Sequence, residues 1–184
     1  MKTLPLVVLC ALLASSTRGV VAQTTRPAPR ARAPAIEVVD LKGLEAAVAK
    51  HRGKALLVNF WAIWCEPCVA ELPGFLATGR AFAGKGAVVL TVSYDLMVPD
   101  VTRDGVLKQM RDFVASHRID APVYIYDAPD YDAINARFGL PGPVPATIAI
   151  DKDGAIVDRH AGKADKAKFE AMMRKALGIS GRES

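Results

Sequence analysis

Two cysteines separated by two residues are the first feature of this sequence that can do chemistry. Cys65 and Cys68 lie in "NFWAIWCEPCVAELP", which runs from an apolar stretch into the expected start of a helix. Free backbone N–H groups and the helix dipole favour negative charge at such a junction, so we expect Cys65 to be the attacking thiolate. Cys68, in the first turn and directed more toward the interior, is close enough to form a disulfide with it. The spacing predicts a redox pair.

Metal binding and a structural role are the alternatives for this pair. A zinc site with this spacing normally needs a second pair of ligands, and the third cysteine, Cys10, lies in the N-terminal segment. A copper-handling chaperone stays open, because the fold can bring His117 or His160 to the two thiols. A structural disulfide that closes so short a loop adds little stability. We predict no metal ligand and no cofactor, since no glycine-rich dinucleotide fingerprint follows a strand.

The N-terminal segment has the features of an export signal. Residues 1–22 combine Lys2, an apolar run and small residues before the expected cleavage site. A membrane anchor is the alternative, although residues 15–18, "SSTR", interrupt the apolar run before the roughly 20 residues that span a bilayer. We predict a periplasmic or otherwise extracytoplasmic protein, in which a thiol pair meets an oxidising environment.

The rest of the chain divides into a linker, one domain and a tail. Residues 23–35, "QTTRPAPRARAPA", are rich in Pro, Ala and Arg and predict an extended linker. Residues 36–180 are expected to form one globular domain, because 51% of the chain is hydrophobic, and residues 181–184 form the tail. Cleavage removes Lys2 and Arg18, which leaves a net charge of about +3. This charge is too small to indicate nucleic-acid binding, and we expect a monomer.

The apolar pattern of the domain is typical of an α/β fold. We expect the order helix, strand, helix, strand, helix, strand, helix, strand, strand, helix. The helix that begins after Cys65 is expected to end near Gly79, and "LMVPDVTRDG" is expected to be a polar loop. A turn at Asp153-Gly154 joins the last two strands. Short crossovers then give parallel strands, the hairpin adds an antiparallel edge, and helices flank a mixed central sheet on both faces.

Two motifs together carry a family resemblance. "VNFWAIWCEPC", followed later by "VPATIAIDKDG", resembles a thioredoxin-fold protein. More narrowly, "WCEPCVAELP" is similar to the exported TlpA-like and ResA-like thiol–disulfide oxidoreductases, several of which serve cytochrome c maturation. The resemblance spans roughly Leu41 to Leu177. It implies a thioredoxin fold and disulfide-containing exported proteins as partners.

The resemblance also implies a substrate-binding edge beside the cysteines. It places a cis-proline at Pro145, and it gives the backbone of Val144 to an extended segment of the target protein. Pro143 is a rival for the cis position, because "GPVP" has one residue more than the family pattern. Trp64 is expected to cover Cys65 and to limit which partners reach it.

The resemblance assigns proton handling to Glu71. In the ResA-like motif this glutamate lies near the cysteine pair and influences thiol protonation. Its spacing puts it on the helix face of Cys68, so it can take the proton from that thiol; an exposed helix carboxylate is the alternative. Asn59 stands where thioredoxins have a buried acid, which leaves Glu71 as the substitute.

The residues between the cysteines favour a reductant. Glu66 places a carboxylate beside Cys65 and Pro67 contributes no N–H, so both oppose a strongly stabilised thiolate. We predict a protein-disulfide reductase that is itself reduced by a membrane thiol transporter. A disulfide oxidase or isomerase is the nearest alternative. The "PxxxTxxC" loop of thiol peroxidases is absent from the sequence.

Overall fold

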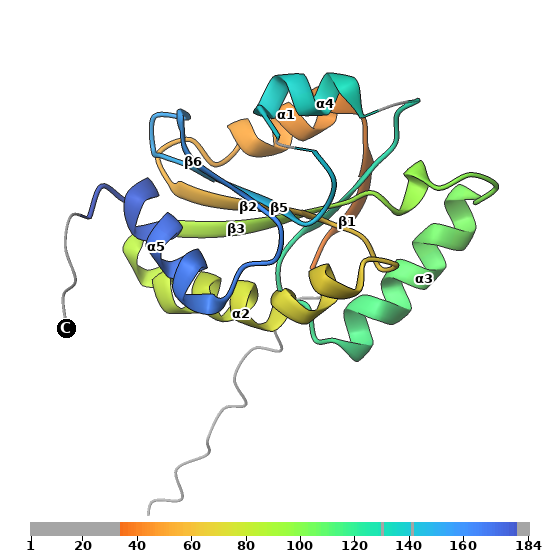
Figure 1. The fold of residues 1–184 in the computed structure, drawn as a ribbon, viewed down its shortest axis with the longest axis horizontal. Coiled ribbons are helices and arrows are strands. Elements are labelled where there is room, and N and C mark those ends of the chain that lie inside the picture. The colour runs from red at the N-terminus through yellow and green to blue at the C-terminus, as the bar shows by residue number, and fades with distance from the viewer. Residues whose placement is uncertain (1–33, 130, 141, 180–184) are drawn as a thin grey trace, which may run out of the picture. The chain divides into compact units, whose positions relative to one another are not determined.

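The computed structural model describes residues 34–129, 131–140 and 142–179 (Figure 1). The predicted signal peptide, linker residues 23–33 and the tail lie outside the described residues. The described elements, in chain order, are β1 (Ile36–Val39), α1 (Leu41–Ala49), β2 (Ala55–Trp61), α2 (Glu66–Phe82), β3 (Ala87–Ser93), α3 (Arg103–Ser116), β4 (Val123–Tyr126), α4 (Asp132–Phe138), β5 (Ala146–Ile150), β6 (Ile156–Ala161) and α5 (Lys166–Ala176). None of the described helices is long and apolar enough to cross a membrane.

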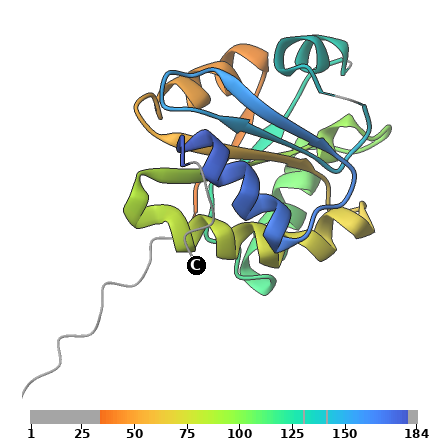
Figure 2. The same cartoon turned by 60° about the vertical axis from the view of Figure 1, so that its left-hand side comes forward.

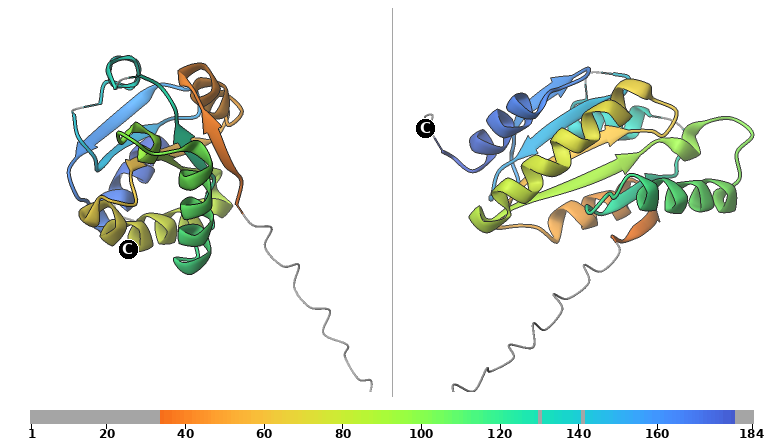
Figure 3. Two further views of the ribbon diagram at one scale, coloured as in Figure 1. Left: turned by 90° about the vertical axis from the view of Figure 1, so that its right-hand side faces the viewer. Right: turned by 90° about the horizontal axis from the view of Figure 1, so that it is seen from below.

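The strands form one mixed sheet in the order β1-β4-β3-β2-β5-β6. The first four strands of this order are parallel, whereas β5 is antiparallel to β2 and β6 is antiparallel to β5. Helices α2, α3 and α5 cover one face, and α1 and α4 cover the other (Figure 1). Figures 2 and 3 show α2 and α5 side by side on their face. The predicted α/β class, with helices on both faces of a mixed sheet, is confirmed.

The central strand β2 explains how the site is placed. Every residue of β2 is buried, as expected for an apolar run covered on both faces. Because side chains alternate between faces, Leu57 and Trp61 pack with the α2 side, while Val58 and Phe60 pack with the α1 side. Asn59 therefore belongs to the α2 face, the face that carries the cysteines.

Two expectations about the sheet are wrong. Ile36–Val39 forms a strand that we did not predict; it pairs with β4, and its four half-buried or exposed residues are too few to show a period. The antiparallel pairing also begins one strand earlier than predicted, because β5 already runs against β2. The apolar pattern of β5 is the same in either direction, so it could not indicate which way the strand runs.

Two expectations about helix bounds are also wrong. Helix α2 continues past Gly79 to Phe82, because this glycine serves packing: a Cβ there would lie 2.6 Å from Cγ2 of Val89 on β3. The predicted polar loop is shorter than expected, since α3 already begins at Arg103. The Thr102 hydroxyl caps α3 by accepting a hydrogen bond from the N–H of Gly105.

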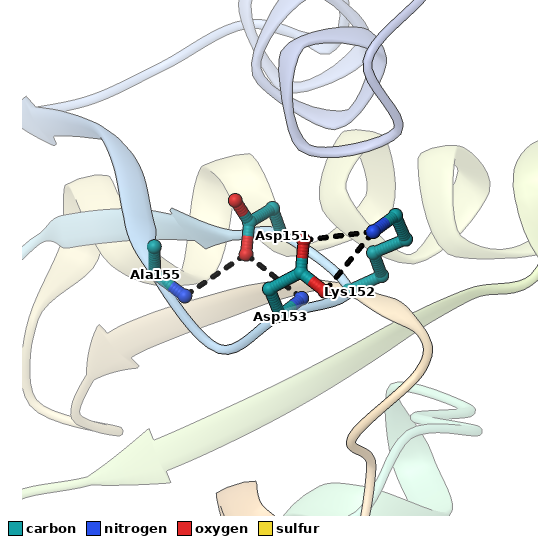
Figure 4. A network of polar contacts seen from close by, with 4 residues as sticks. All are labelled: Asp151, Lys152, Asp153 and Ala155. Atoms are coloured by element: carbon teal, nitrogen blue, oxygen red, sulfur yellow. Dashed lines mark hydrogen bonds and ion pairs between the residues drawn. The ribbon is translucent and has the colours of Figure 1, made fainter.

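The predicted hairpin turn between β5 and β6 is confirmed. The Asp151 carboxylate accepts hydrogen bonds from the N–H groups of Asp153 (3.0 Å) and Ala155 (2.9 Å), while Lys152 pairs with the Asp153 carboxylate (Figure 4). Gly154 has a φ of +90°, in the left-handed region that favours glycine. The turn fixes the register that brings β6 back beside β5.

Candidate active site

The cysteine pair lies at the junction between the end of β2 and the start of α2. Cys65 is the N-cap of α2, in an extended conformation, and it forms a disulfide with Cys68, with the two Cα atoms 5.2 Å apart. Cys65 keeps 6% exposure, whereas Cys68 is fully buried. The prediction that Cys68 points more to the interior is confirmed.

The first turn of α2 offers hydrogen-bond donors to the Cys65 sulfur. The Cys65 carbonyl already accepts the N–H of Val69 at 3.0 Å, but the disulfide-bonded side chain caps no N–H. Pro67 has no N–H, so the donors that a thiolate at this N-cap can use are those of Glu66 and Cys68. The Glu66 side chain is exposed at the first helical position.

Glu71 is a buried carboxylate, so the alternative of an exposed helix glutamate is wrong. The residue is 3% exposed. Its Oε1 accepts a hydrogen bond from Nδ2 of Asn59 at 2.7 Å, and its Oε2 accepts one from the N–H of Ala164 at 2.8 Å. The same Asn59 Nδ2 lies 3.0 Å from Oγ1 of Thr147. Glu71 is thus held by Asn59 on β2 and by the segment before α5, and Thr147 on β5 in turn contacts Asn59.

Burial raises the pKa of Glu71 above its ordinary value. The hydrogen bonds from Ala164 and Asn59 oppose this shift, as do the positive charges of His160 and Lys163, but burial is the largest effect. The group is therefore easier to protonate than an exposed glutamate, and its titration moves toward neutral pH.

A polar row leads from Glu71 to the edge of the sheet. Asn59, Thr147 and His160 are consecutive partners across β2, β5 and β6. His160 and Lys163 also line a cavity of about 570 Å³, and Glu71 forms part of its wall. The carboxylate thus lies between a buried amide and a cavity large enough for water.

The expected cis-proline is present beside the cysteines. The Val144–Pro145 bond is cis, and within the described chain the bond before the rival, Pro143, is not. Val144 packs against the core cluster that contains Cys65 and Cys68. Among the described residues, nothing forms a backbone hydrogen bond with Val144, whereas the Pro145 carbonyl accepts the N–H of Gly162 at 2.8 Å.

Trp64 lies next to the pair but outside the core. It is 56% exposed and shares the wall of a cavity of about 450 Å³ with Val144 and two tyrosines, Tyr94 and Tyr131. That Trp64 covers Cys65 stays a prediction. Trp61 is fully buried and packs on Phe113, with ring centroids 5.4 Å apart, so packing explains it.

Asp95 is a second buried carboxylate, and our reading of the sequence missed it. Both of its oxygens lie 3.1 Å from the N–H of Ile63, two residues before Cys65, and one accepts the Ser93 hydroxyl at 2.6 Å. Burial raises the pKa of Asp95 above its ordinary value. An acid at the carboxyl end of a buried parallel strand was the available signal, because side chains there meet at one edge of the sheet.

No group of three or more His, Cys, Asp or Glu residues is placed to hold a metal ion among the described residues. This finding concerns the described ranges alone.

The fold and the site define a class of protein. The site is a Cys-x-x-Cys disulfide at the start of a helix, packed against a cis-proline loop on a mixed sheet. This arrangement defines a thioredoxin-like thiol–disulfide oxidoreductase. The chain belongs to the AhpC/TSA family, whose model matches residues 29–159. The resemblance stated from the sequence is confirmed.

Three relatives illustrate the match. The thiol-disulfide oxidoreductase ResA of Bacillus thuringiensis is 29% identical over 143 residues, which cover 78% of this chain and 75% of the relative. The thioredoxin-like protein YneN of Bacillus subtilis is 31% identical over 139 residues, covering 76% and 75%. A crystal structure of a thiol:disulfide interchange protein of the thioredoxin family from Chlorobium tepidum has a TM-score of 0.57 at 26% identity, covering 71% of this chain and 84% of that one.

Proposed function

We propose that this protein is an exported reductase of protein disulfides. Its substrates are disulfide-containing exported proteins, such as those of cytochrome c or copper-enzyme maturation. The observation that carries the proposal is the buried Glu71, held by Asn59 one helical turn from Cys68. Export rests on the signal-like residues 1–22.

The cycle begins at Cys65. Its thiolate, capped by the free N–H groups of the first turn of α2, attacks one sulfur of the target disulfide. A bond forms between Cys65 and that sulfur, the target disulfide breaks, and the second target sulfur leaves as a thiolate. The exposure of Cys65, small but greater than that of Cys68, fits this role.

Cys68 then releases the product. Its sulfur attacks the Cys65 sulfur, so the enzyme disulfide re-forms and the reduced target leaves with its electron pair. The attacking thiol must lose a proton, and Glu71 follows Cys68 by three residues, the spacing at which helix side chains are neighbours. Because burial raises its pKa, Glu71 accepts a proton more readily than an exposed glutamate does, which suits it to take the proton from Cys68.

Two features support the reducing direction. Glu66 lies at the start of α2 beside Cys65, where its negative charge opposes a thiolate. Pro67 takes one N–H donor away from the same sulfur. A couple whose reduced form is weakly stabilised gives its electrons away, and we propose a membrane thiol transporter as the donor that restores them. The protein acts as a monomer in this scheme.

The target binds along the cis-proline loop. The backbone of Val144, outside β5 and without a hydrogen-bond partner among the described residues, suits the addition of a short extended segment. Trp64 lies at the same cavity and limits which segments approach.

A trapping experiment tests this function. In Cys68→Ser the second step is blocked, so exported proteins of the native host should stay attached to Cys65 and be released by dithiothreitol. The matched control is Cys65→Ser, which keeps one thiol but lacks the attacking one and should trap far less. Equal trapping by both variants, or capture of no exported protein by Cys68→Ser, would contradict the proposal.

A further inference from the structure

Asp95 holds the turn that leads into Cys65. The N–H of Cys65 donates to the carbonyl of Ala62 at 3.2 Å, so residues 62–65 form a tight turn between β2 and α2. Both carboxylate oxygens of Asp95 lie 3.1 Å from the amide nitrogen of Ile63, the second residue of this turn. The carboxylate therefore links the segment after β3 to the turn that carries the reactive cysteine.

The contacts of Asp95 are those of an ionised carboxylate. The Ser93 hydroxyl donates to its Oδ2 at 2.6 Å, the length of a hydrogen bond to a charged oxygen. The same Ser93 oxygen accepts the N–H of Asp95 at 3.1 Å, which leaves the hydroxyl proton for the carboxylate. Burial raises the pKa of Asp95, and the hydrogen bonds from Ser93 and Ile63 oppose this rise.

No cation offsets this charge among the residues that the structure describes. Asp95 is 4% exposed, and no Lys or Arg of the described ranges forms an ion pair with it. Its titratable neighbour is Tyr131, whose pKa is raised by burial and by the Asp95 charge, so this phenol stays neutral. A buried charge is screened less by water and salt than an exposed one, and its field therefore reaches further.

Cys65 lies within reach of this field. Ile63 precedes Cys65 by two residues, so their Cα atoms are at most about 7.6 Å apart. At roughly 10 Å and an effective dielectric constant of about 20, a negative charge raises the pKa of a thiol by about one. Glu66 carries the same sign of charge, but its side chain is exposed, so water weakens its effect on the thiolate.

We propose that Asp95 is a positioning residue for the redox pair: its carboxylate fixes the turn of residues 62–65 through Ile63, and its negative charge disfavours the Cys65 thiolate. The inference deepens the proposed function and rests on it for its consequence, because a weakly stabilised thiolate makes the couple a better reductant. Asp95 takes no proton in the cycle, which distinguishes its role from that of Glu71.

The variant Asp95→Asn separates the charge from the hydrogen bonds. Its amide oxygen can still accept the N–H of Ile63 and its amide nitrogen can donate to Ser93, whereas the charge is lost. Alkylation of Cys65 by iodoacetamide is followed against pH in the Cys68→Ser background, by the mass of the peptide that contains Cys65. We expect the midpoint of this profile to fall by about one in Asp95→Asn. An unchanged midpoint would overturn the proposal.

Further variants show whether charge or packing moves the midpoint. Asp95→Ala should lower it as Asp95→Asn does, so either variant serves as the test if the other fails to fold, which urea unfolding checks. Ser93→Ala keeps the charge and removes one hydrogen bond, and a fall equal to that of Asp95→Asn would assign the effect to packing and contradict the proposal. Asp112→Asn, at an exposed position, should leave the midpoint unchanged.

The alkylation needs no target protein, so its failure is distinct from a failure of the proposed function. An unchanged midpoint in both Asp95 variants contradicts the role of Asp95 alone. Capture of no exported protein by Cys68→Ser contradicts the reductase function instead.

Discussion

The amide nitrogen of Asn59 lies 2.7 Å from Oε1 of Glu71, so a strand amide holds a helix carboxylate inside the core. From the resemblance to thioredoxins, we assign Asn59 to the strand position at which they carry a buried acid. In this protein the buried carboxylate belongs instead to Glu71 on α2, one helical turn from Cys68. In the proposed mechanism the proton acceptor therefore lies on the helix of the cysteine pair, and it is buried in the core.

Replacing Glu71 with Gln should slow the release of the target. General acid–base catalysis typically contributes 10²–10⁴-fold, so we expect roughly a 100-fold slower second step. Formation of the mixed disulfide, which precedes the proton transfer, should keep its rate. Acid-quenched time courses separate the two steps. Glu37→Gln, at an exposed position on β1, is the control, and an equal loss in both steps would argue against the assigned role.

Replacing Asn59 with Asp should make stability depend on pH. The new carboxylate faces Glu71, and burial already raises the pKa of Glu71, so the pair will retain a proton well above the ordinary range. A carboxyl group whose pKa is higher in the folded than in the unfolded protein contributes its full share of the unfolding free energy at low pH. That contribution is lost as the pH rises through the folded-state pKa. Urea unfolding should therefore show a larger loss, relative to wild type, at pH 8 than at pH 5.

The double variant Asn59→Asp/Glu71→Gln supplies the control for this effect. It removes one of the two facing carboxylates, so the pH dependence of the loss should shrink. A loss that is the same at both pH values in the single variant would show that the two groups do not interact.

The sequence predicted the reactive residues of this site better than the residues that hold them in place. The cysteine pair follows from its spacing, whereas Glu71 and the cis bond at Pro145 follow from the family resemblance, and the structure places these residues as expected. Thr147 on β5 contacts Asn59, and the Ala164 N–H before α5 contacts Glu71, so both roles depend on strand pairing and packing that no local pattern states. Strand β1 escaped prediction because its four half-buried or exposed residues are too few to show a period.

Removing the Asp95 carboxylate should loosen the loop before Cys65. In Asp95→Ala the N–H of Ile63 and the Ser93 hydroxyl lose their acceptor, and an unsatisfied buried group costs about 1–3 kcal/mol. We expect a loss of unfolding free energy of this size in urea, with faster alkylation of reduced Cys65. Asp112→Ala, which breaks an exposed pair with Lys108, should have little effect on either measurement. Similar losses in both variants would contradict this assignment.

Replacing Gly79 with Ala should test why α2 runs past a residue that we expected to end it. The added Cβ would lie 2.6 Å from Cγ2 of Val89, and overpacking of this kind typically costs about 1–3 kcal/mol. Gly84→Ala is the control, because no atom lies within 4 Å of its Cβ position. Val89→Ala should restore part of the stability of Gly79→Ala; if Gly79→Ala is neutral, α2 does not need this close approach to β3.

The equilibrium reduction potential of the Cys65–Cys68 couple against glutathione tests the central claim most directly. A reductase with Glu66 and Pro67 between its cysteines should lie below about −200 mV, toward the roughly −270 mV of thioredoxin. A potential near the roughly −120 mV of a strong disulfide oxidant would contradict the account.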